Sequence, residues 1–318
     1  MAAIFVFVDG VGVGAPDPEV NPLARGEYLL SRFVGGDGPA LPRGGRAGAA
    51  DATLGVPGRP QSATGQTTIL TGKNAAAALG RHLLGFPNAA LRALLTDHSL
   101  FRAAAAAGRT ATFANAYPAA YLRALGLGGG DEPGPELPAR RRARPAATTV
   151  AFSAAGRPFH TWGDARRGAA LTHDLTGVRA NRWGAELPPR APEEAAHILL
   201  ALAARHDLTV FEFFETDEAG HARSMEQAAE ALGRLDRFLR AVVAGLGAGD
   251  SLVVTSDHGN LEDLSTRNHT RAPVPVLGFG PAAERVEGVR DLTEIAPLLL
   301  GLVGAAGGSS GSSSGSGG

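Results

Sequence analysis

The sequence has no cysteine, and Lys73 is its only lysine. The lack of cysteine excludes disulfide bonds, thiolate metal ligands and a cysteine nucleophile. Arginine therefore carries almost all of the positive charge, and the 30 basic and 31 acidic residues nearly cancel. A balance of this kind gives no electrostatic reason to expect a nucleic-acid partner or an acidic membrane surface.

Long apolar runs are also missing. No segment approaches the roughly 20 consecutive apolar residues that a membrane-spanning helix needs. The apolar N-terminal stretch is short, has no basic residues before it and reaches Asp9 too soon for a signal peptide. We therefore expect a soluble, cytoplasmic protein without a membrane partner.

Short runs of β-branched and aromatic residues predict strands that are buried in a sheet. These runs are residues 4–8, 209–214, 251–255 and 274–279. The prolines of the last run predict a strand at an edge of the sheet or at its entrance. Apolar residues at helical spacing predict helices at 224–246 and 295–303. Strands that alternate with helices predict an α/β fold with a doubly wound, mostly parallel sheet.

The middle of the chain differs in composition from its ends. It contains glycine- and proline-rich breaks, one β-like stretch at 110–117 and an arginine cluster at 140–144. We predict that residues 89–205 form a smaller α/β cap domain, inserted into a catalytic core made of the flanking segments 1–88 and 206–304. The last segment, 305–318, has the glycine and serine composition of a flexible tail.

Acidic residues and histidines follow three of the predicted strands. They are Asp9 after the first strand, Asp217 and His221 after the second, and Asp257, His258 and His269 after the third. Loops at the carboxyl ends of the strands form the ligand site of an open α/β sheet. Carboxylate and imidazole ligands without sulfur suit Zn²⁺ or Mn²⁺. Two such ions about 4 Å apart can stabilise the attacking and leaving oxygens of a displacement at phosphorus.

A candidate nucleophile lies in the stretch "QSATGQTT", just before a predicted helix. A hydroxyl of Ser62 at a helix N-terminus would face backbone N–H groups, which favour an alkoxide and a phosphoryl group. Thr64 is the alternative nucleophile. Taken alone, Ser62 fits the role of a helix cap better.

Five motifs together resemble those of the alkaline phosphatase superfamily. They are Asp9-Gly10, the Ser62-x-x-Gly65 turn, "TDEAGH", "TSDHGN" and "NHTRAPVP". The most similar branch is that of cofactor-independent phosphoglycerate mutase and phosphopentomutase. The stretch "SDHGNLED" is similar to the former, and the short interval from His258 to His269 is closer to the latter. The resemblance covers roughly residues 1–88 and 206–304.

This resemblance implies a two-metal site and a covalent intermediate. It assigns one divalent cation, Mn²⁺ or Zn²⁺, to Asp217, His221 and His269, and a second to Asp9, Ser62, Asp257 and His258. It further implies that a small phosphorylated metabolite transfers its phosphoryl group to Ser62 and then to an acceptor. If the acceptor is another oxygen of the same substrate, the enzyme is a mutase; if it is water, the enzyme is a phosphatase.

Four further residues are candidates for substrate contact, namely Lys73, His82, Arg182 and Arg271. A solvated helix face explains Lys73 and His82 better than substrate contact does, and we expect Glu262 to be a solvated side chain. Two other functions remain open. The same core could carry a phosphodiesterase or nucleotide pyrophosphatase, or it could be a metal-binding scaffold without catalysis. The complete ligand set argues against the scaffold, because buried polar groups are costly to keep.

Overall fold

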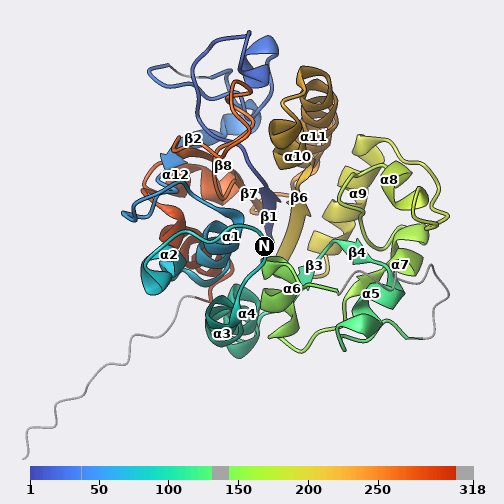
Figure 1. The fold of residues 1–318 in the computed structure, drawn as a ribbon. Helices are drawn as coiled ribbons and strands as arrows, with labels where there is room; N and C mark the ends of the chain where they lie inside the picture. The colour runs from blue at the N-terminus through green and yellow to red at the C-terminus, as the bar shows by residue number, and fades with distance from the viewer. Residues whose placement is uncertain (37, 131–142, 306–318) are drawn as a thin grey trace, which may run out of the picture.

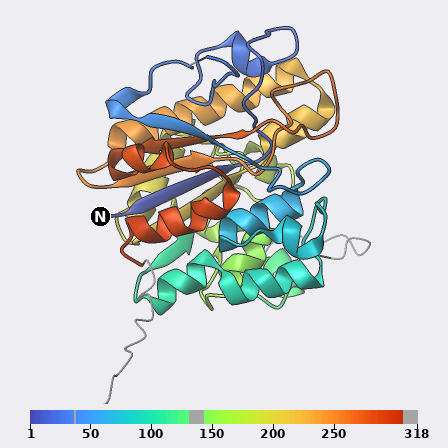
Figure 2. The same ribbon diagram turned by 90° about the vertical axis from the view of Figure 1, so that its left-hand side faces the viewer.

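The central feature of the computed structural model, which describes residues 1–36, 38–130 and 143–305, is a six-stranded sheet with helices on both faces (Figure 1, Figure 2). Its strand order is β2-β8-β7-β1-β6-β3. The strands are β1 (Ala3–Val8), β2 (Arg46–Ala50), β3 (Ala111–Phe113), β6 (Leu208–Phe213), β7 (Ser251–Thr255) and β8 (Val274–Phe279). The neighbours β7, β1, β6 and β3 are parallel, and β8 is antiparallel to both β7 and β2. The predicted doubly wound, mostly parallel α/β fold is confirmed.

Strand β8 corrects one detail of the prediction. Its prolines suggested an edge or a strand entrance, and the edge is ruled out because β2 pairs along its outer side, from Arg46 opposite Gly278 to Ala50 opposite Val274. Strand β2 has the sequence RAGAA, which contains no β-branched or aromatic residue, so its composition gave no strand signal. Pro275 is the second residue of β8, close to the start of the strand, where a missing N–H group is tolerated.

Helices cover both faces of the sheet. Their bounds are α1 (Ser62–Thr71), α2 (Ala75–Leu79), α3 (Ala89–His98), α4 (Leu100–Ala106), α5 (Ala119–Ala124), α6 (Ala147–Ser153), α7 (Trp162–Arg166), α8 (Val178–Asn181), α9 (Pro192–Ala203), α10 (Glu215–Ala222), α11 (Met225–Gly245), α12 (Ala283–Val286) and α13 (Ile295–Leu302). One face packs against α1, α4, α6 and α13, and the opposite face packs against α9, α10 and α11.

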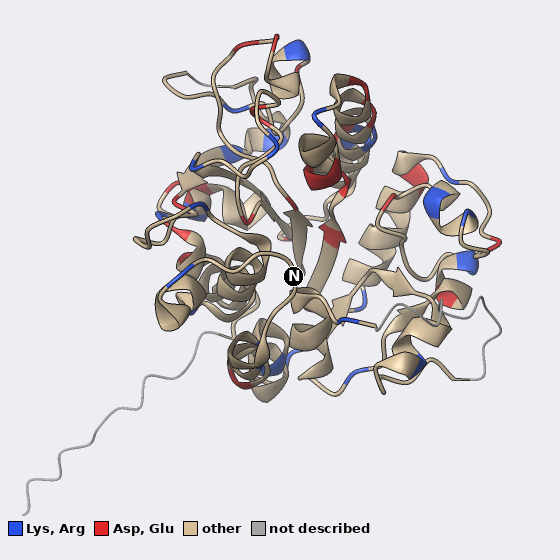
Figure 3. Cartoon of the chain, viewed as in Figure 1, with Lys and Arg blue, Asp and Glu red and all other residues tan. Residues whose placement is uncertain are grey.

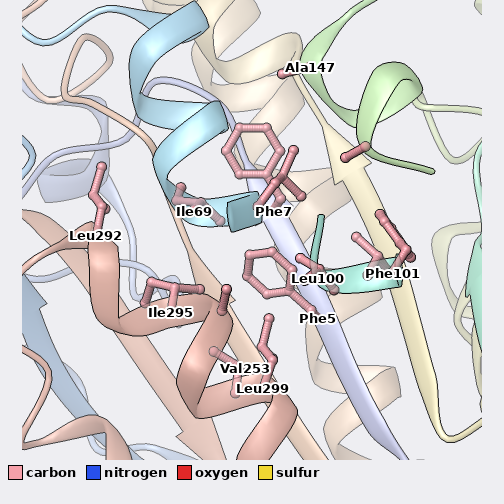
Figure 4. Close-up of a cluster of buried hydrophobic side chains, with 14 of the residues drawn as sticks. Phe5, Phe7, Ile69, Leu100, Phe101, Ala147, Val253, Leu292, Ile295 and Leu299 are labelled. Atoms are coloured by element: carbon pink, nitrogen blue, oxygen red, sulfur yellow. The ribbon is translucent and has the colours of Figure 1, made fainter. Parts of the chain in front are cut away.

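Strand β1 shows why the sheet needs both layers. Successive side chains of a strand point to opposite faces. Phe5 and Phe7 belong to the cluster that contains α1 and α13 (Figure 4), whereas Ile4 and Val6 belong to the cluster that contains α11. All six residues of β1 are buried, so an uninterrupted apolar run is the sequence that this position requires.

The segment 89–205 contributes to the central layers and also forms a small unit beside them. Strand β3 pairs with β6, and α9 packs against α11 in the same buried cluster. Strands β4 (Ala116–Tyr117) and β5 (His160–Thr161) form a separate two-stranded sheet, next to a small cluster that includes Ala165 and Leu187. The division of the chain into a core and a cap stays a prediction.

Charged residues of both signs are interspersed along the fold (Figure 3). Within the described residues, none of the helices combines the length and the apolar character needed to cross a membrane. The predicted tail from 306 onward, and Arg140, Arg141 and Arg142 of the arginine cluster, lie outside the described residues.

Candidate metal centre

The ligand candidates come from the carboxyl ends of three adjacent strands. Strands β7, β1 and β6 lie side by side and run in the same direction, so the loops that follow them meet at one edge of the sheet. Asp9 directly follows β1, α10 begins two residues after β6, and Asp257 lies two residues after β7. The topology thus brings together residues that are more than 200 positions apart in the sequence.

The first cluster consists of Asp217, His221 and His269. The Nε2 atoms of the two histidines lie 3.1 Å apart, and they lie 3.2 and 3.6 Å from the two carboxylate oxygens of Asp217. Each Nδ1 lies within hydrogen-bond distance of a backbone carbonyl, at 2.9 Å for His221 and 3.0 Å for His269. A neutral imidazole that donates through Nδ1 keeps its lone pair on Nε2. Two lone pairs and a carboxylate therefore face a common point, which is the arrangement that a cation needs.

The second cluster is centred on His258. Its Nε2 lies 3.0 Å from Ser62 Oγ, 3.3 Å from Asp9 Oδ1 and 3.4 Å from Asp257 Oδ2. Both carboxylate oxygens are buried and have no hydrogen-bond partner among the described residues. A buried carboxylate oxygen without a partner is costly, and a bound cation removes that cost. The donor set therefore fits a divalent ion.

The two clusters share one residue and are in contact. One ligand atom each of Asp9, Asp217 and His258 lie within 4.8 Å of one another, so Asp217 faces both clusters. The rings of His258 and His269 are stacked, with 3.7 Å between their centroids. The structure brings all seven predicted metal ligands to one place.

Burial controls the protonation of the site. Burial, together with neighbouring carboxylates, raises the pKa of Asp9 well above its ordinary value and that of Asp257 to about 7. Burial lowers the pKa of both His258 and His269 to about 4, so both imidazoles are neutral near pH 7. Burial also opposes ionisation of Asp217, but the hydrogen bonds to His221 and Asn260 and the nearby histidines together outweigh it, and the pKa falls to about 2. Neutral imidazole is the form that binds a metal.

Ser62 is the first residue of α1, so the structure separates it from the alternative nucleophile. The cap position belongs to Gln61, and the N–H groups of the first turn lack partners within the helix. Ser62 is partly exposed, whereas Thr64 is buried. The Thr64 hydroxyl donates to the Gln61 carbonyl over 3.0 Å and accepts from Leu83 N over 3.3 Å. This geometry favours Ser62 over Thr64 as the nucleophile.

The four candidates for substrate contact occupy different places. His82 Nε2 lies 3.3 Å from the carbonyl of Val56, in the loop that leads to Ser62. Lys73 follows the C-terminal end of the ten-residue helix α1, which puts its backbone about 15 Å from Ser62 and weakens its candidacy. Arg271 is exposed two residues after His269. Arg182 lines a cleft of about 370 Å³ between the α8 segment and the helices α10 and α11.

Several residues that the sequence reasoning missed support the ligands. Asn260 Nδ2 donates to Asp217 Oδ1 over 2.7 Å, and Gln66 Nε2 donates to Asp9 Oδ2 over 3.2 Å. Asn260 belongs to the "SDHGN" motif, which was a usable signal. Glu262 was expected to be solvated, and this is wrong, because its side chain is buried and hydrogen-bonded.

Glu212 is a second buried acid that was missed. It lies in β6 among apolar residues, and Thr148 Oγ1 donates to its Oε2 over 2.6 Å. Burial raises the pKa of Glu212 to about 7. An acid in the middle of the apolar run "TVFEFF" was the available signal, since a charged residue there needs a specific reason.

A doubly wound α/β sheet with this cluster at its carboxyl edge defines the class of an alkaline-phosphatase-like metalloenzyme fold. Comparisons with known proteins agree. The family model described as "Metalloenzyme superfamily" matches residues 187–306. The structure of alkaline phosphatase from the Antarctic bacterium TAB5 superimposes with a TM-score of 0.55 at 12% identity, and the match covers 96% of this chain and 98% of that one. At this identity, the likeness shows the fold alone.

Two curated relatives have similar sequences over part of their length. The 2,3-bisphosphoglycerate-independent phosphoglycerate mutase of Cereibacter sphaeroides (strain ATCC 17029 / ATH 2.4.9) is 39% identical over 121 residues, which are 35% of this chain and 24% of the mutase. The phosphopentomutase of Methylobacterium sp. (strain 4-46) is 37% identical over 163 residues, which are 48% of this chain and 37% of that enzyme. The chain thus spans well under half of either relative. The predicted resemblance to the alkaline phosphatase superfamily is confirmed as a resemblance, and the family model that matches residues 187–306 describes metalloenzymes.

Proposed function

We propose that this chain is a two-metal phosphotransferase that acts on a small phosphomonoester through a phosphoserine at Ser62. One observation carries the proposal. Ser62 Oγ lies 3.0 Å from His258 Nε2, at the N-terminus of α1 and beside a cluster of buried carboxylates. A hydroxyl that reaches a ligand cluster and a helix N-terminus at once is placed to accept a phosphoryl group.

The residues present would hold two ions, Mn²⁺ or Zn²⁺. We assign Asp217, His221 and His269 to one ion, and Asp9, Ser62, Asp257 and His258 to the other. The unpartnered, buried oxygens Asp9 Oδ1 and Asp257 Oδ2 support this assignment. Such ions, when bound, lower the pKa of a hydroxyl and neutralise the charge of phosphoryl oxygens.

The chain's own residues then have distinct tasks. Ser62 Oγ forms a bond to phosphorus while the ester bond of the substrate breaks, and the departing alcohol takes up the proton that Ser62 loses. The free N–H groups at the start of α1 bind phosphoryl oxygens. Asn260 and Gln66 fix the orientation of the Asp217 and Asp9 carboxylates. Transfer to another oxygen of the same substrate completes a mutase cycle, and transfer to water completes a phosphatase cycle.

We also propose that residues 89–205 contain a cap that selects the substrate. The small unit around β4, β5, α7 and α8 lies beside the central layers, and its Arg182 lines the cleft that borders α10. On α10 the cleft is lined by Glu215 and Glu218, and the same helix carries Asp217 and His221, so the cleft and the metal centre adjoin one helix. A guanidinium at this position suits a carboxylate or phosphate group.

A substrate panel tests the proposal. The purified protein is incubated with phosphomonoesters of sugars and of small acids and with a phosphodiester, with Mn²⁺ or Zn²⁺, and both free phosphate and isomerised product are followed. We expect turnover of a phosphomonoester that stops when a chelator removes the metal. Turnover that a chelator leaves unchanged would refute the metal centre, and a clear preference for the diester would favour a phosphodiesterase.

A further inference from the structure

We propose that Glu262 is a positioning residue that holds the loop after β1 and two parts of the loop between β7 and β8 in one arrangement. This inference rests on the proposed metal centre. Glu262 is 3% exposed, lies four residues after His258 and faces none of the assigned ligand atoms in a direct contact that the structure shows. Its carboxylate is instead the common acceptor for three segments, of which the one at Gly12 is 250 positions away and the other two belong to the same loop as Glu262.

The hydrogen bonds of Glu262 reach each of those segments. Oε2 accepts from Gly12 N over 2.9 Å and from Asn260 N over 2.8 Å, and Oε1 accepts from Thr270 Oγ1. Gly12 lies three residues after Asp9, Asn260 lies two residues after His258, and Thr270 is the neighbour of His269. Both oxygens are thereby used to connect the backbone around three proposed ligands.

The loops are built around this carboxylate at close range. A Cβ atom at Gly12, or one at Gly259, would lie less than 3.0 Å from side-chain atoms of Glu262. Gly259 also accepts a hydrogen bond from Thr270 N over 3.0 Å, so the two parts of this loop that hold His258 and His269 pair directly with each other. Two glycines therefore leave the space that the Glu262 side chain fills, and its removal would leave the three segments without their common contact.

The chemistry of the contacts predicts a specific order of variants. In Glu262→Gln, the amide oxygen can still accept from both backbone N–H groups, and the amide NH₂ can donate to Thr270 Oγ1. In Glu262→Ala, all three donors lose their partner. If hydrogen-bond geometry is what matters, the Gln variant keeps most of the function that the Ala variant loses. If the negative charge is what matters, the Gln and Ala variants should lose the function to the same extent, because both lack the charge.

The test measures Mn²⁺ binding to metal-free protein by isothermal titration calorimetry, next to the thermal unfolding midpoint. We expect Glu262→Ala to weaken Mn²⁺ binding about 10- to 100-fold and Glu262→Gln to weaken it less than about tenfold, which is the range for residues that orient metal ligands. Asp207→Ala is the matched control. Its carboxylate accepts two hydrogen bonds from Thr110, a residue distant in sequence, but at the opposite edge of the sheet. Its loss should lower the unfolding midpoint without changing Mn²⁺ affinity.

Each outcome has a definite meaning. Wild-type affinity in Glu262→Ala, or equal losses in the Ala and Gln variants, would overturn the positioning role. If Glu262→Ala does not fold, Gly12→Ala replaces it, because the added Cβ displaces the carboxylate. Weakened binding in that variant supports the role, and unchanged binding overturns it. Failure of the wild-type protein to bind Mn²⁺ would refute the proposed metal centre itself, together with this inference.

Discussion

The two edges of the central sheet carry acids of opposite character. At the carboxyl edge, Asp9 and Asp257 are buried, and each has an oxygen without a hydrogen-bond partner among the described residues. At the amino edge, Asp207 Oδ2 accepts from both the backbone N–H and the hydroxyl of Thr110 at 2.8 Å. Burial raises the pKa of Asp257 to about 7, whereas the Thr110 hydrogen bonds lower the pKa of Asp207.

This contrast separates Asp207, which stabilises the folded state, from Asp257, which destabilises it. Ionised Asp207 stabilises the folded state, because the hydrogen bonds from Thr110 favour the carboxylate more than water does in the unfolded chain. Ionised Asp257 destabilises it, because folding removes water and supplies too few donors. Asp207 precedes β6 and Asp257 follows β7, two strands of the same sheet, so the difference lies in the loops. A chain that keeps an unfavourable group at one edge has a functional reason for it.

The largest effect that would sharpen this comparison is expected for Ser62→Ala. Loss of the nucleophile should lower kcat by at least about 10³, as for other nucleophiles. The fold should persist, because losing one partly exposed hydroxyl and its contact with His258 costs only about 1 kcal/mol. Steady-state kinetics and circular dichroism check both statements. Thr64→Val is the control and should retain most of the turnover; the reverse pattern would assign the nucleophile to Thr64.

An intermediate effect is expected for Asp257→Asn, which should lower the Mn²⁺ affinity but raise the stability of the metal-free protein. The variant should bind Mn²⁺ at least about tenfold more weakly, because a charged ligand is lost. Its metal-free form should nevertheless be more stable than the wild type at pH 8, by on the order of 2 to 4 kcal/mol.

The pH dependence follows from the direction of the shift. The folded state keeps the Asp257 proton up to about pH 7, whereas the unfolded chain releases it near its ordinary value of about 3.9. The folded state thus binds more protons in this window, and wild-type stability falls as the pH rises through it. The advantage of the variant should vanish below about pH 4 and grow toward pH 7. Denaturant unfolding of both metal-free proteins measures it, and an advantage that did not change with pH would contradict the assignment.

The smallest effect is expected for Asp207→Asn at the amino edge. It should destabilise the protein by about 1 kcal/mol, because the hydrogen bonds to Thr110 are weakened. The folded pKa of Asp207 is lowered, so its contribution is present above its ordinary pKa and is lost as the pH falls through the folded value. Turnover and metal content should not change. A loss of activity comparable to that of Asp257→Asn would erase the distinction between the two edges.

The sequence predicted the elements whose signal is local. The buried strands β1, β6 and β7 read as apolar runs, and the ligand candidates stood directly after them. Strand β2 could not be predicted, because a run of alanine and glycine becomes a strand only by pairing with β8. Of the two positions that the prolines of β8 suggested, the edge was wrong for the same reason, whereas Pro275 does lie at the entrance of the strand.

The burial of Glu262 could not be predicted from the sequence, for a different physical reason. Its donors are Gly12, Asn260 and Thr270, and the contact from Gly12 spans 250 positions. An acid in a polar loop reads as solvated until the chain closes around it. The convergence of the seven proposed ligands was predictable because the parallel sheet brings strand ends together by topology, whereas hydrogen bonds between loops depend on the detailed course of each loop.

The central claim is that the phosphoryl group passes through Ser62, and it can be tested directly. Wild-type protein is mixed with a substrate that it turns over, quenched in acid during turnover, digested and analysed by mass spectrometry. The account predicts a phosphate on the peptide that contains Ser62, absent from the Ser62→Ala variant. Turnover without a phosphate on any peptide, together with a near-normal rate of Ser62→Ala, would contradict it and indicate direct attack by water.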